Sequence, residues 1–221
     1  MSNSQPVPTR ITRFAMVNAY LVPEDDGLTL VDTGMGMAKR IQEAAATLGA
    51  PITRIALTHA HGDHIGSLDA LAAALPGVEV AISARDARLM AKDKTLQPGE
   101  SGTLRGSYPG ARTKPTRLLT AGDRIGSLEV IAAPGHTPGH VAFLDTRDGT
   151  LFCGDAFTTI GGVATTARLP WRFPLAYVAT WDREIELETA RSLRALDPAR
   201  LAPGHGKIVE NPGAAMDAAI G

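Results

Sequence analysis

The chain has 221 residues, of which 44% are hydrophobic and 20% are charged, the composition of an ordinary globular protein. Its 22 Lys and Arg residues nearly balance 23 Asp and Glu residues, and the net charge of -1 argues against electrostatic binding of nucleic acid. No apolar run approaches the roughly 20 residues that span a bilayer, and residues 1–10 lack the apolar centre of a secretory signal, so we expect a cytoplasmic protein without a membrane partner.

Strand and helix patterns alternate along the first part of the chain. Residues 10–22 are rich in Ile, Val, Phe, Tyr and Thr, which favours strands, and the turn at 23–27 closes them. Apolar residues then recur at helical spacing from Met37 to Leu48, where Gly49 ends the helix. The further elements expected here are strands at 28–31, 54–57 and 78–82 and a helix at 68–75.

The second part of the chain continues the alternation. The expected elements are strands at 128–132, 140–144, 151–153 and 199–202 and a long helix at 180–196. Because strands and helices intermix throughout, the sequence predicts an α/β or α+β fold with layered packing, in a single domain of residues 1–221.

Two segments interrupt this rhythm. Residues 84–115 begin as a helix and then become irregular, and residues 157–177 carry aromatic side chains among prolines and glycines. These aromatic residues are Phe157, Trp171, Phe173 and Tyr177. Long irregular segments are usually functional loops, so we expect a lid-like insertion at 84–115 and an aromatic wall over a cleft for a substrate with an apolar portion. The alternatives are a solvated insertion and aromatic rings that only pin the loop to the core.

One short string concentrates metal-binding side chains. Thr58-His59-Ala60-His61-Gly62-Asp63-His64 follows a predicted strand and precedes a predicted helix. In extended chain His59 and His61 lie on one side, about 6.6 Å apart along the strand, and both rings can reach one ion. Gly62 permits a tight turn that brings Asp63 and His64 to a second position. Imidazole and carboxylate ligands together suit zinc, and also iron, manganese or cobalt.

Three further candidate ligands stand at the ends of other predicted strands. They are His136, Asp155 and His205, each with a glycine directly before it. A glycine there lets the backbone approach an ion closely while the strand delivers the ligand. The sequence therefore predicts more than one metal position at one edge of the sheet structure.

These residues in this order resemble the metallo-β-lactamase superfamily. The resemblance rests on His59-Ala60-His61-Gly62-Asp63-His64 followed by His136, Asp155 and His205, and on Asp32-Thr33-Gly34 and Gly135-His136-Thr137-Pro138-Gly139-His140. It covers most of the chain and implies an αββα sandwich, in which two mixed sheets face each other, helices lie outside and the metals lie at one edge.

The resemblance also implies a role for each residue. His59, His61 and His136 would hold the first metal, Asp63, His64 and His205 would hold the second, and Asp155 would bridge both. Two divalent ions are implied, with zinc expected first and manganese, iron or cobalt as alternatives. Asp63 is a plausible proton acceptor. His140 and Asp32 would not bind metal but support the residues that do.

The resemblance favours a hydrolase that uses metal-bound hydroxide to cleave an ester, lactone, thioester, amide or phosphoester bond in a small molecule. Glyoxalase II is similar in these motifs but carries a helical domain for its glutathione thioester, and only Gly206–Gly221 follow His205 here. Acyl-homoserine lactonases place a tyrosine soon after the bridging aspartate, where this chain has Phe157. Neither substrate is therefore favoured.

The alternative is an iron-dependent sulfur (persulfide) dioxygenase on the same fold. Such relatives use one metal, held by residues like His59, His136 and Asp155. A second ligand set is unnecessary for that chemistry, whereas here Asp63, His64 and His205 complete one. A metal-binding protein without catalysis is a third interpretation, and the intact ligand set argues against it.

Overall fold

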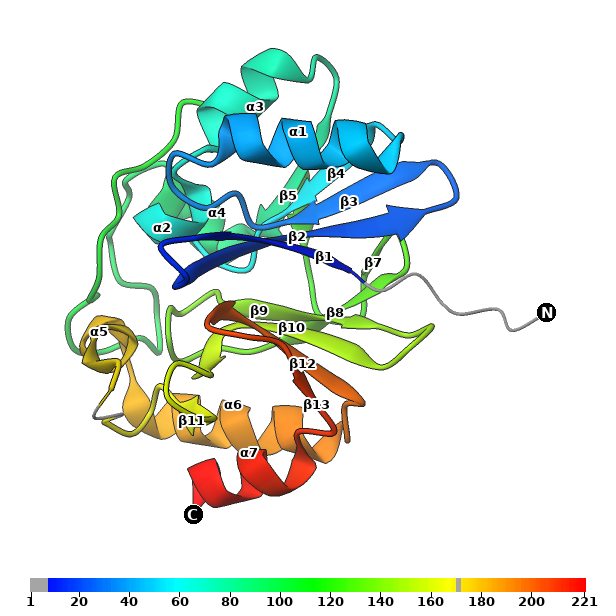
Figure 1. The fold of residues 1–221 in the computed structure, drawn as a ribbon. Coiled ribbons are helices and arrows are strands. Elements are labelled where there is room, and N and C mark those ends of the chain that lie inside the picture. The colour runs from blue at the N-terminus through cyan, green and yellow to red at the C-terminus, as the bar shows by residue number, and fades with distance from the viewer. Residues whose placement is uncertain (1–7, 170–171) are drawn as a thin grey trace.

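The computed structural model describes residues 8–169 and 172–221 as two halves with strands inside and helices outside (Figure 1). The strands of the first half are β1 (Thr9–Arg13), β2 (Val17–Glu24), β3 (Gly27–Val31), β4 (Ile52–Ala56), β5 (Glu79–Ser83) and β6 (Arg117–Leu119). Its helices are α1 (Ala38–Leu48), α2 (Gly62–Ile65), α3 (Leu68–Ala74) and α4 (Ala84–Met90).

The second half repeats the arrangement on the other side. Its strands are β7 (Arg124–Ile125), β8 (Leu128–Ala132), β9 (Val141–Asp145), β10 (Thr150–Thr158), β11 (Ala164–Thr165), β12 (Arg200–His205) and β13 (Val209–Glu210). Its helices are α5 (Pro174–Ala179), α6 (Arg183–Ala195) and α7 (Gly213–Ile220). In Figure 1, α1 and α3 cover one outer face and α6 and α7 cover the opposite one. The expected αββα architecture is confirmed.

The sheet is mixed and continuous. Strands β3 to β6 pair in parallel, as do β10 and β12, while β1–β2–β3 and β7–β8–β9–β10 are antiparallel. The two halves join where Val17, the first residue of β2, pairs with His205, the last residue of β12. The two expected sheets are thus halves of one curled sheet, and the junction lies at a predicted metal ligand.

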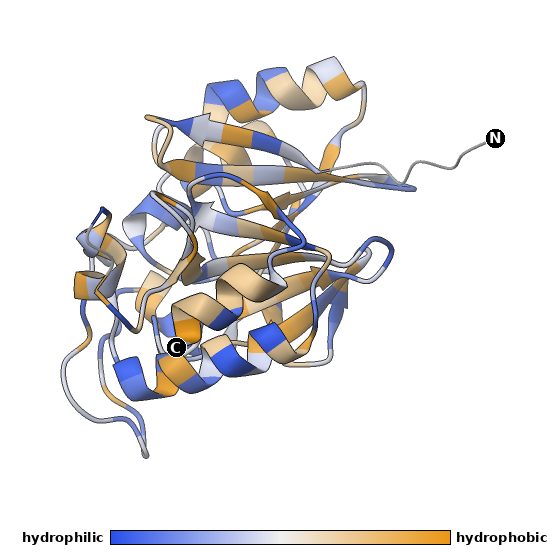
Figure 2. Ribbon diagram, turned by 60° about the horizontal axis from the view of Figure 1, so that its bottom comes forward, coloured by the Kyte–Doolittle hydropathy of each residue, from blue (hydrophilic) through white to orange (hydrophobic). Residues whose placement is uncertain are grey.

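Three hydrophobic cores separate the layers. The first packs α1 and α3 against one half of the sheet around Ile41 and Leu71, and the third packs α6 and α7 against the other half around Leu193 and Met216. The middle core lies between the halves and includes Tyr20, Val31, Phe143 and Phe152. In Figure 2, α6 is striped in hydrophilic and hydrophobic colours, as one buried face requires.

The second half departs from the sequence-based boundaries in ways that matter for the site. Strand β10 runs to Thr158 rather than ending at 153, so Asp155 lies within a strand. The segment 157–177 was expected to be irregular, but it begins inside β10 and ends inside α5. Helix α7 was not predicted. None of the helices in the described chain is long and apolar enough to span a membrane.

We expect Phe143→Ala to lower the free energy of unfolding by about 3–5 kcal/mol, because the ring is fully buried in the middle core. The measurement is urea denaturation followed by circular dichroism at a fixed metal concentration. Leu118→Ala is the control, since Leu118 is 55% exposed and its loss should cost less than about 0.5 kcal/mol. Equal effects of the two substitutions would contradict a packed core between the halves.

Candidate metal centre

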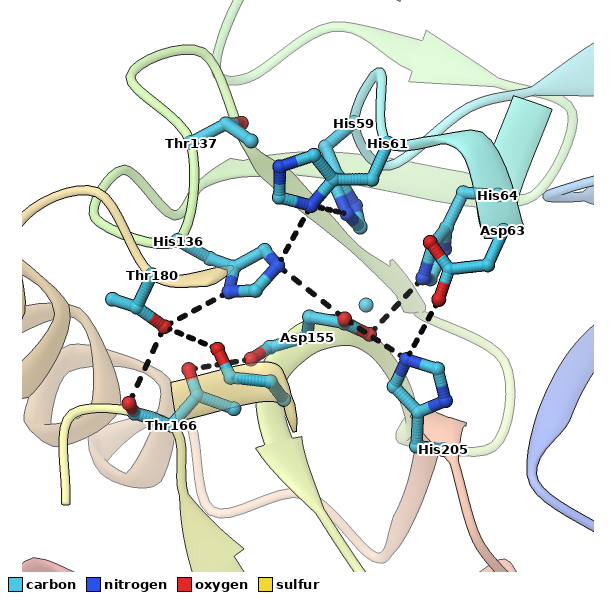
Figure 3. Close-up of polar contacts among 12 residues, drawn as sticks. His59, His61, Asp63, His64, His136, Thr137, Asp155, Thr166, Thr180 and His205 are labelled. Atoms are coloured by element: carbon cyan, nitrogen blue, oxygen red, sulfur yellow. Dashed lines mark hydrogen bonds and ion pairs between the residues drawn. The ribbon is translucent and has the colours of Figure 1, made fainter. Parts of the chain in front are cut away.

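The seven predicted ligands meet at one edge of the sheet structure (Figure 3). His59 and His61 follow β4, Asp63 and His64 lie on α2, His136 follows β8, Asp155 lies in β10 and His205 ends β12. Six of these residues are buried, and the Asp63 side chain is 37% exposed. Residues far apart in the chain therefore converge in a pocket shielded from water.

The first ligand set consists of three histidines with nitrogen atoms in close contact. His59 Nε2 lies 3.1 Å from His61 Nδ1, which lies 3.0 Å from His136 Nε2. Nitrogen atoms bound tetrahedrally to one zinc ion at about 2.05 Å would be about 3.3 Å apart. The spacing of the three atoms fits a shared cation.

In each of these three rings, the hydrogen-bond acceptor beside the outer nitrogen fixes the tautomer of the imidazole. The carbonyl of Arg105 can only accept, and the hydroxyls of Thr58 and Thr180 are free to accept because they donate to Asp32 and to the Ala176 carbonyl. The outer contacts are His61 Nε2 to Arg105 O, His59 Nδ1 to Thr58 Oγ1 and His136 Nδ1 to Thr180 Oγ1, each at 3.0 Å. The inner nitrogens consequently carry lone pairs that point at one another, an arrangement that a cation stabilises.

Burial keeps these three rings neutral. It lowers the pKa of His59 and of His136 well below the ordinary value, and it lowers the pKa of His61 to about 4. Neutral imidazole is the form that binds metal.

The second ligand set surrounds the other side of Asp155. His64 Nε2 lies 3.2 Å from Asp155 Oδ1, and His205 Nε2 lies 3.1 Å from Asp155 Oδ2 and 3.3 Å from Asp63 Oδ2. Asp155 Oδ2 is also 3.4 Å from His136 Nε2, so this carboxylate faces both sets. His64 Nε2 and Asp155 Oδ1 are buried without a hydrogen-bond partner. A bound cation would satisfy both atoms, and the residues present fit a two-metal centre.

Negative charge is concentrated in this second set. Burial alone would lower the pKa of His64, but the carboxylates of Asp155 and Asp32 outweigh it and raise that pKa well above the ordinary value. Burial is likewise outweighed at His205, where Asp155 and Asp63 raise the pKa to about 9. The protein field here favours positive charge, whether a proton or a metal ion.

Asp32 and His140 lie directly behind the ligands. Asp32 accepts hydrogen bonds from His64 Nδ1–H at 2.8 Å and from the backbone N–H of Thr58 at 2.8 Å. His140 donates from Nδ1 to the Ala133 carbonyl at 2.9 Å, and its Nε2 accepts the backbone N–H of Asp155 at 3.1 Å. Each therefore orients a ligand without facing the inner cluster.

Asp86 is a supporting residue that the sequence did not reveal. Its buried carboxylate accepts from the N–H of Ala60 at 2.8 Å, the hydroxyl of Thr137 at 2.9 Å and the N–H of Gly139 at 3.0 Å. It thus joins the loop that carries His59 and His61 to the loop that carries His136. In the sequence near Asp86, the one recognisable feature is the N-cap of α4, where the Asp86 N–H donates to Ser83 Oγ. An N-cap does not indicate the contacts that Asp86 makes with distant residues.

Glu186 is a second buried acid behind the centre. Burial raises the pKa of its carboxyl well above the ordinary value. Thr166 Oγ1 lies 3.2 Å from Glu186 Oε1 and donates its own proton to the Asp155 carbonyl at 2.7 Å. Thr166 therefore connects Glu186 to the backbone carbonyl of Asp155.

A cavity of about 160 Å³ opens over the ligands. Its lining residues are Met16, Val17, His61, Asp63, Ser107, His136, Asp155, Phe173, Leu175, Ala176, Ala179 and His205. Phe173 lies in this wall, as expected, with its ring 4.9 Å from that of His205. Phe157 does not. It is fully buried in the core under α6 because β10 continues through it.

Of the other two predicted aromatic positions, Tyr177 does not contribute to this wall. Tyr177 is absent from the lining of the cavity, and Arg183 lies 3.9 Å over its ring. Trp171 lies outside the described residues.

The segment 84–115 borders the same cavity. The Tyr108 ring packs 4.7 Å from the ring of His61, and Ser107 lines the opening. An ion pair between Arg85 and Glu100, and a hydrogen bond of 2.9 Å from Trp181 Nε1 to the Ser101 carbonyl, hold the segment in place. It forms a wall in this structure, and its movement as a lid stays a prediction.

The chain is similar to several known proteins. The model of the metallo-beta-lactamase superfamily matches residues 12–205. The uncharacterized protein YobT of Bacillus subtilis (strain 168) is 47% identical over 207 residues, which cover 92% of this chain and 89% of YobT. The hydroxyacylglutathione hydrolase of Acidiphilium cryptum (strain JF-5) is 31% identical over 86% of this chain and 73% of its own length. The crystal structure of TTHA1623 in a di-iron-bound form has a TM-score of 0.71 and 28% identity, covering 95% of this chain and 97% of that one.

We expect the protein reconstituted with excess zinc to bind two equivalents, as measured by elemental analysis after gel filtration. Asp155→Ala should weaken both positions because its carboxylate faces both ligand sets, whereas His205→Ala should retain one equivalent. A plateau at one equivalent for the unsubstituted protein, or two tightly bound ions in Asp155→Ala, would contradict the bridging role.

Asp86→Asn should weaken zinc binding by about 10- to 100-fold and lower the free energy of unfolding by about 1–3 kcal/mol. The amide replaces one acceptor oxygen with a donor that faces backbone N–H groups. Competition with a chelator and urea denaturation measure the two effects. Asp93→Asn in the same segment is the control, since Asp93 pairs only with exposed neighbours. Unchanged zinc affinity in Asp86→Asn would remove Asp86 from the support of the site.

Proposed function

Because the chain belongs to the metallo-beta-lactamase superfamily, we propose that it is a dinuclear metal-dependent hydrolase of small molecules. The bond it cleaves is an ester, lactone, thioester, amide or phosphoester. The observation that carries the proposal is the buried Asp155 carboxylate between two complete sets of nitrogen and oxygen ligands. Such a centre is built for two cations and for the chemistry that a pair of cations supports.

The protein supplies the ligands and their orientation. His59, His61 and His136 would hold one ion, Asp63, His64 and His205 the other, and Asp155 would touch both. When bound, divalent ions lower the pKa of a water ligand toward about 7 and stabilise negative charge on a neighbouring oxygen. The hydrogen bonds to the outer ring nitrogens hold the five imidazoles in the tautomer that this role requires.

Asp63 is the residue that we assign to proton transfer. It is the one ligand whose side chain is substantially exposed, and it lines the cavity over the centre. Its carboxylate can accept a proton from an attacking water and return it to the leaving group. Met16, Phe173 and Leu175 line the same cavity and give it an apolar border.

The relatives support this proposal and broaden the choice of metal. The similarity to a hydroxyacylglutathione hydrolase supports hydrolysis and makes a thioester one candidate bond. The donor set suits zinc, but TTHA1623 is described in a di-iron-bound form. Iron therefore belongs in any test beside zinc and manganese.

A sulfur dioxygenase with one iron is the second candidate. It would use residues like His59, His136 and Asp155 and leave Asp63, His64 and His205 without a metal to bind. The second set is nevertheless complete, and its buried His64 Nε2 lies 3.2 Å from Asp155 Oδ1 without a hydrogen bond. This observation favours the two-metal hydrolase.

The test is a panel of esters, lactones, thioesters, amides and phosphodiesters with zinc-, manganese- and iron-loaded protein. We expect metal-dependent hydrolysis of at least one class and a loss of at least about 100-fold in kcat/KM for Asp155→Ala. Leu118→Ala, far from the centre in sequence and exposed, should keep full activity. Oxygen uptake with a persulfide by protein that holds one iron, without hydrolysis of the panel, would favour the dioxygenase instead.

A further inference from the structure

A second and larger cavity lies beside the metal centre. Its volume is about 540 Å³, and Met35, Ile65, Pro109 and Ala111 give it apolar walls. Asp63 and Ser107 line both this cavity and the small one over the ligands, so the two meet at the exposed ligand. We call the larger cavity the side lobe.

The walls of the side lobe are built by contacts between distant segments. The N–H of Gly62 donates to the Ser107 carbonyl at 2.9 Å, and a Cβ on Gly62 would lie 3.0 Å from Pro109 Cγ. The 107–109 stretch therefore rests directly on α2. The Arg13 guanidinium donates to the Met35 carbonyl and so holds the Met35 loop against β1.

The charges of the side lobe disfavour an anionic ligand. None of its lining residues is cationic, and its two acids are Asp63 and Asp69. The Asp69 carboxylate already accepts from the backbone N–H groups of Arg112 and Thr113, at 3.0 and 2.8 Å, and from the Thr113 hydroxyl at 2.7 Å. Its acceptor positions are occupied by the segment that it anchors, so the surface left for a ligand is mainly apolar.

We propose that the side lobe binds an uncharged apolar arm of the substrate, an acyl, alkyl or aryl group, while the scissile bond lies at the metal centre. This inference rests on the proposed function. The cavity over the ligands, at about 160 Å³, has room for little beyond the reacting group, whereas about 540 Å³ lies in the range of small-molecule sites. An arm that leaves the reacting group past Asp63 and Ser107 enters the side lobe directly.

Linear alkyl hydroxamates test this placement without requiring turnover. The hydroxamate binds metal, and the alkyl tail reports on the space beside it. We expect the Kd for dizinc protein, measured by isothermal titration calorimetry, to fall about fourfold per methylene from acetohydroxamate until the side lobe is filled. A tail that ends in a carboxylate should bind at least about tenfold more weakly than an alkyl tail of equal length, because it meets Asp63 and Asp69.

Matched substitutions locate the effect. Met35→Asp should flatten the dependence on chain length, and Met35→Leu should preserve it. Leu118→Asp, the same kind of change at a similarly exposed side chain (55% against 54% for Met35), should leave it unchanged. Leu175 lines the small cavity and not the side lobe, so Leu175→Asp should also leave the dependence on chain length unchanged.

The outcomes separate the two proposals. Equal affinity for all chain lengths, or a dependence abolished by Leu175→Asp but not by Met35→Asp, overturns the side lobe as the subsite while metal-dependent hydrolysis still supports the hydrolase. If the dizinc protein binds no hydroxamate, the proposed placement of an arm in the side lobe with the reacting group at the metal centre is wrong. A panel that shows no hydrolysis overturns the proposed function itself, whatever the hydroxamates do.

Discussion

The constraint on which the structure depends is the mutual repulsion of the atoms at its centre. Three imidazole lone pairs converge within about 3 Å, and a buried carboxylate lies beside them. In the absence of a cation such a cluster is costly, because burial deprives each group of water without giving it a partner. The fold must therefore hold these residues together, and the binding of a metal ion would offset the free-energy cost of burying them.

The fold meets this constraint because the ligands lie on several segments of the chain and hydrogen bonds connect these segments to one another. The curled sheet closes where His205 pairs with Val17, so a ligand sits on the junction of the two halves. Asp86 joins two ligand loops, and Asp32 holds a third element through His64. Asp86 and Asp32 are both buried carboxylates that accept hydrogen bonds from backbone N–H groups. These hydrogen bonds offset the cost of burying the two charged groups. Stability and metal affinity are consequently carried by the same residues.

Much of this could be predicted from the sequence because the strongest signals are local. The histidine cluster lies within six residues, and helices such as α1 show their period directly. The features that the sequence did not predict depend on contacts between residues far apart in the chain. Strand β10 runs past Asp155 because β12 pairs with it as far as Thr158, and this pairing buries Phe157 in the core. The role of Asp86 depends on contacts more than fifty residues away in the chain, at Thr137 and Gly139, which no spacing rule encodes.

The metal ligands and the cavity walls beside them belong largely to different segments of the chain. The ligands belong to β10, β12, α2 and the short loops after β4 and β8. The cavity walls belong to the 107–111 stretch, the Met35 loop and the segment around α5, which contribute none of the seven predicted ligands. Changes in these walls can alter volume and charge beside the centre while the ligand geometry is preserved. Under the proposed function, substrate choice depends on the side chains that surround the centre. The side lobe beside Asp63 is the larger of the two cavities that they form.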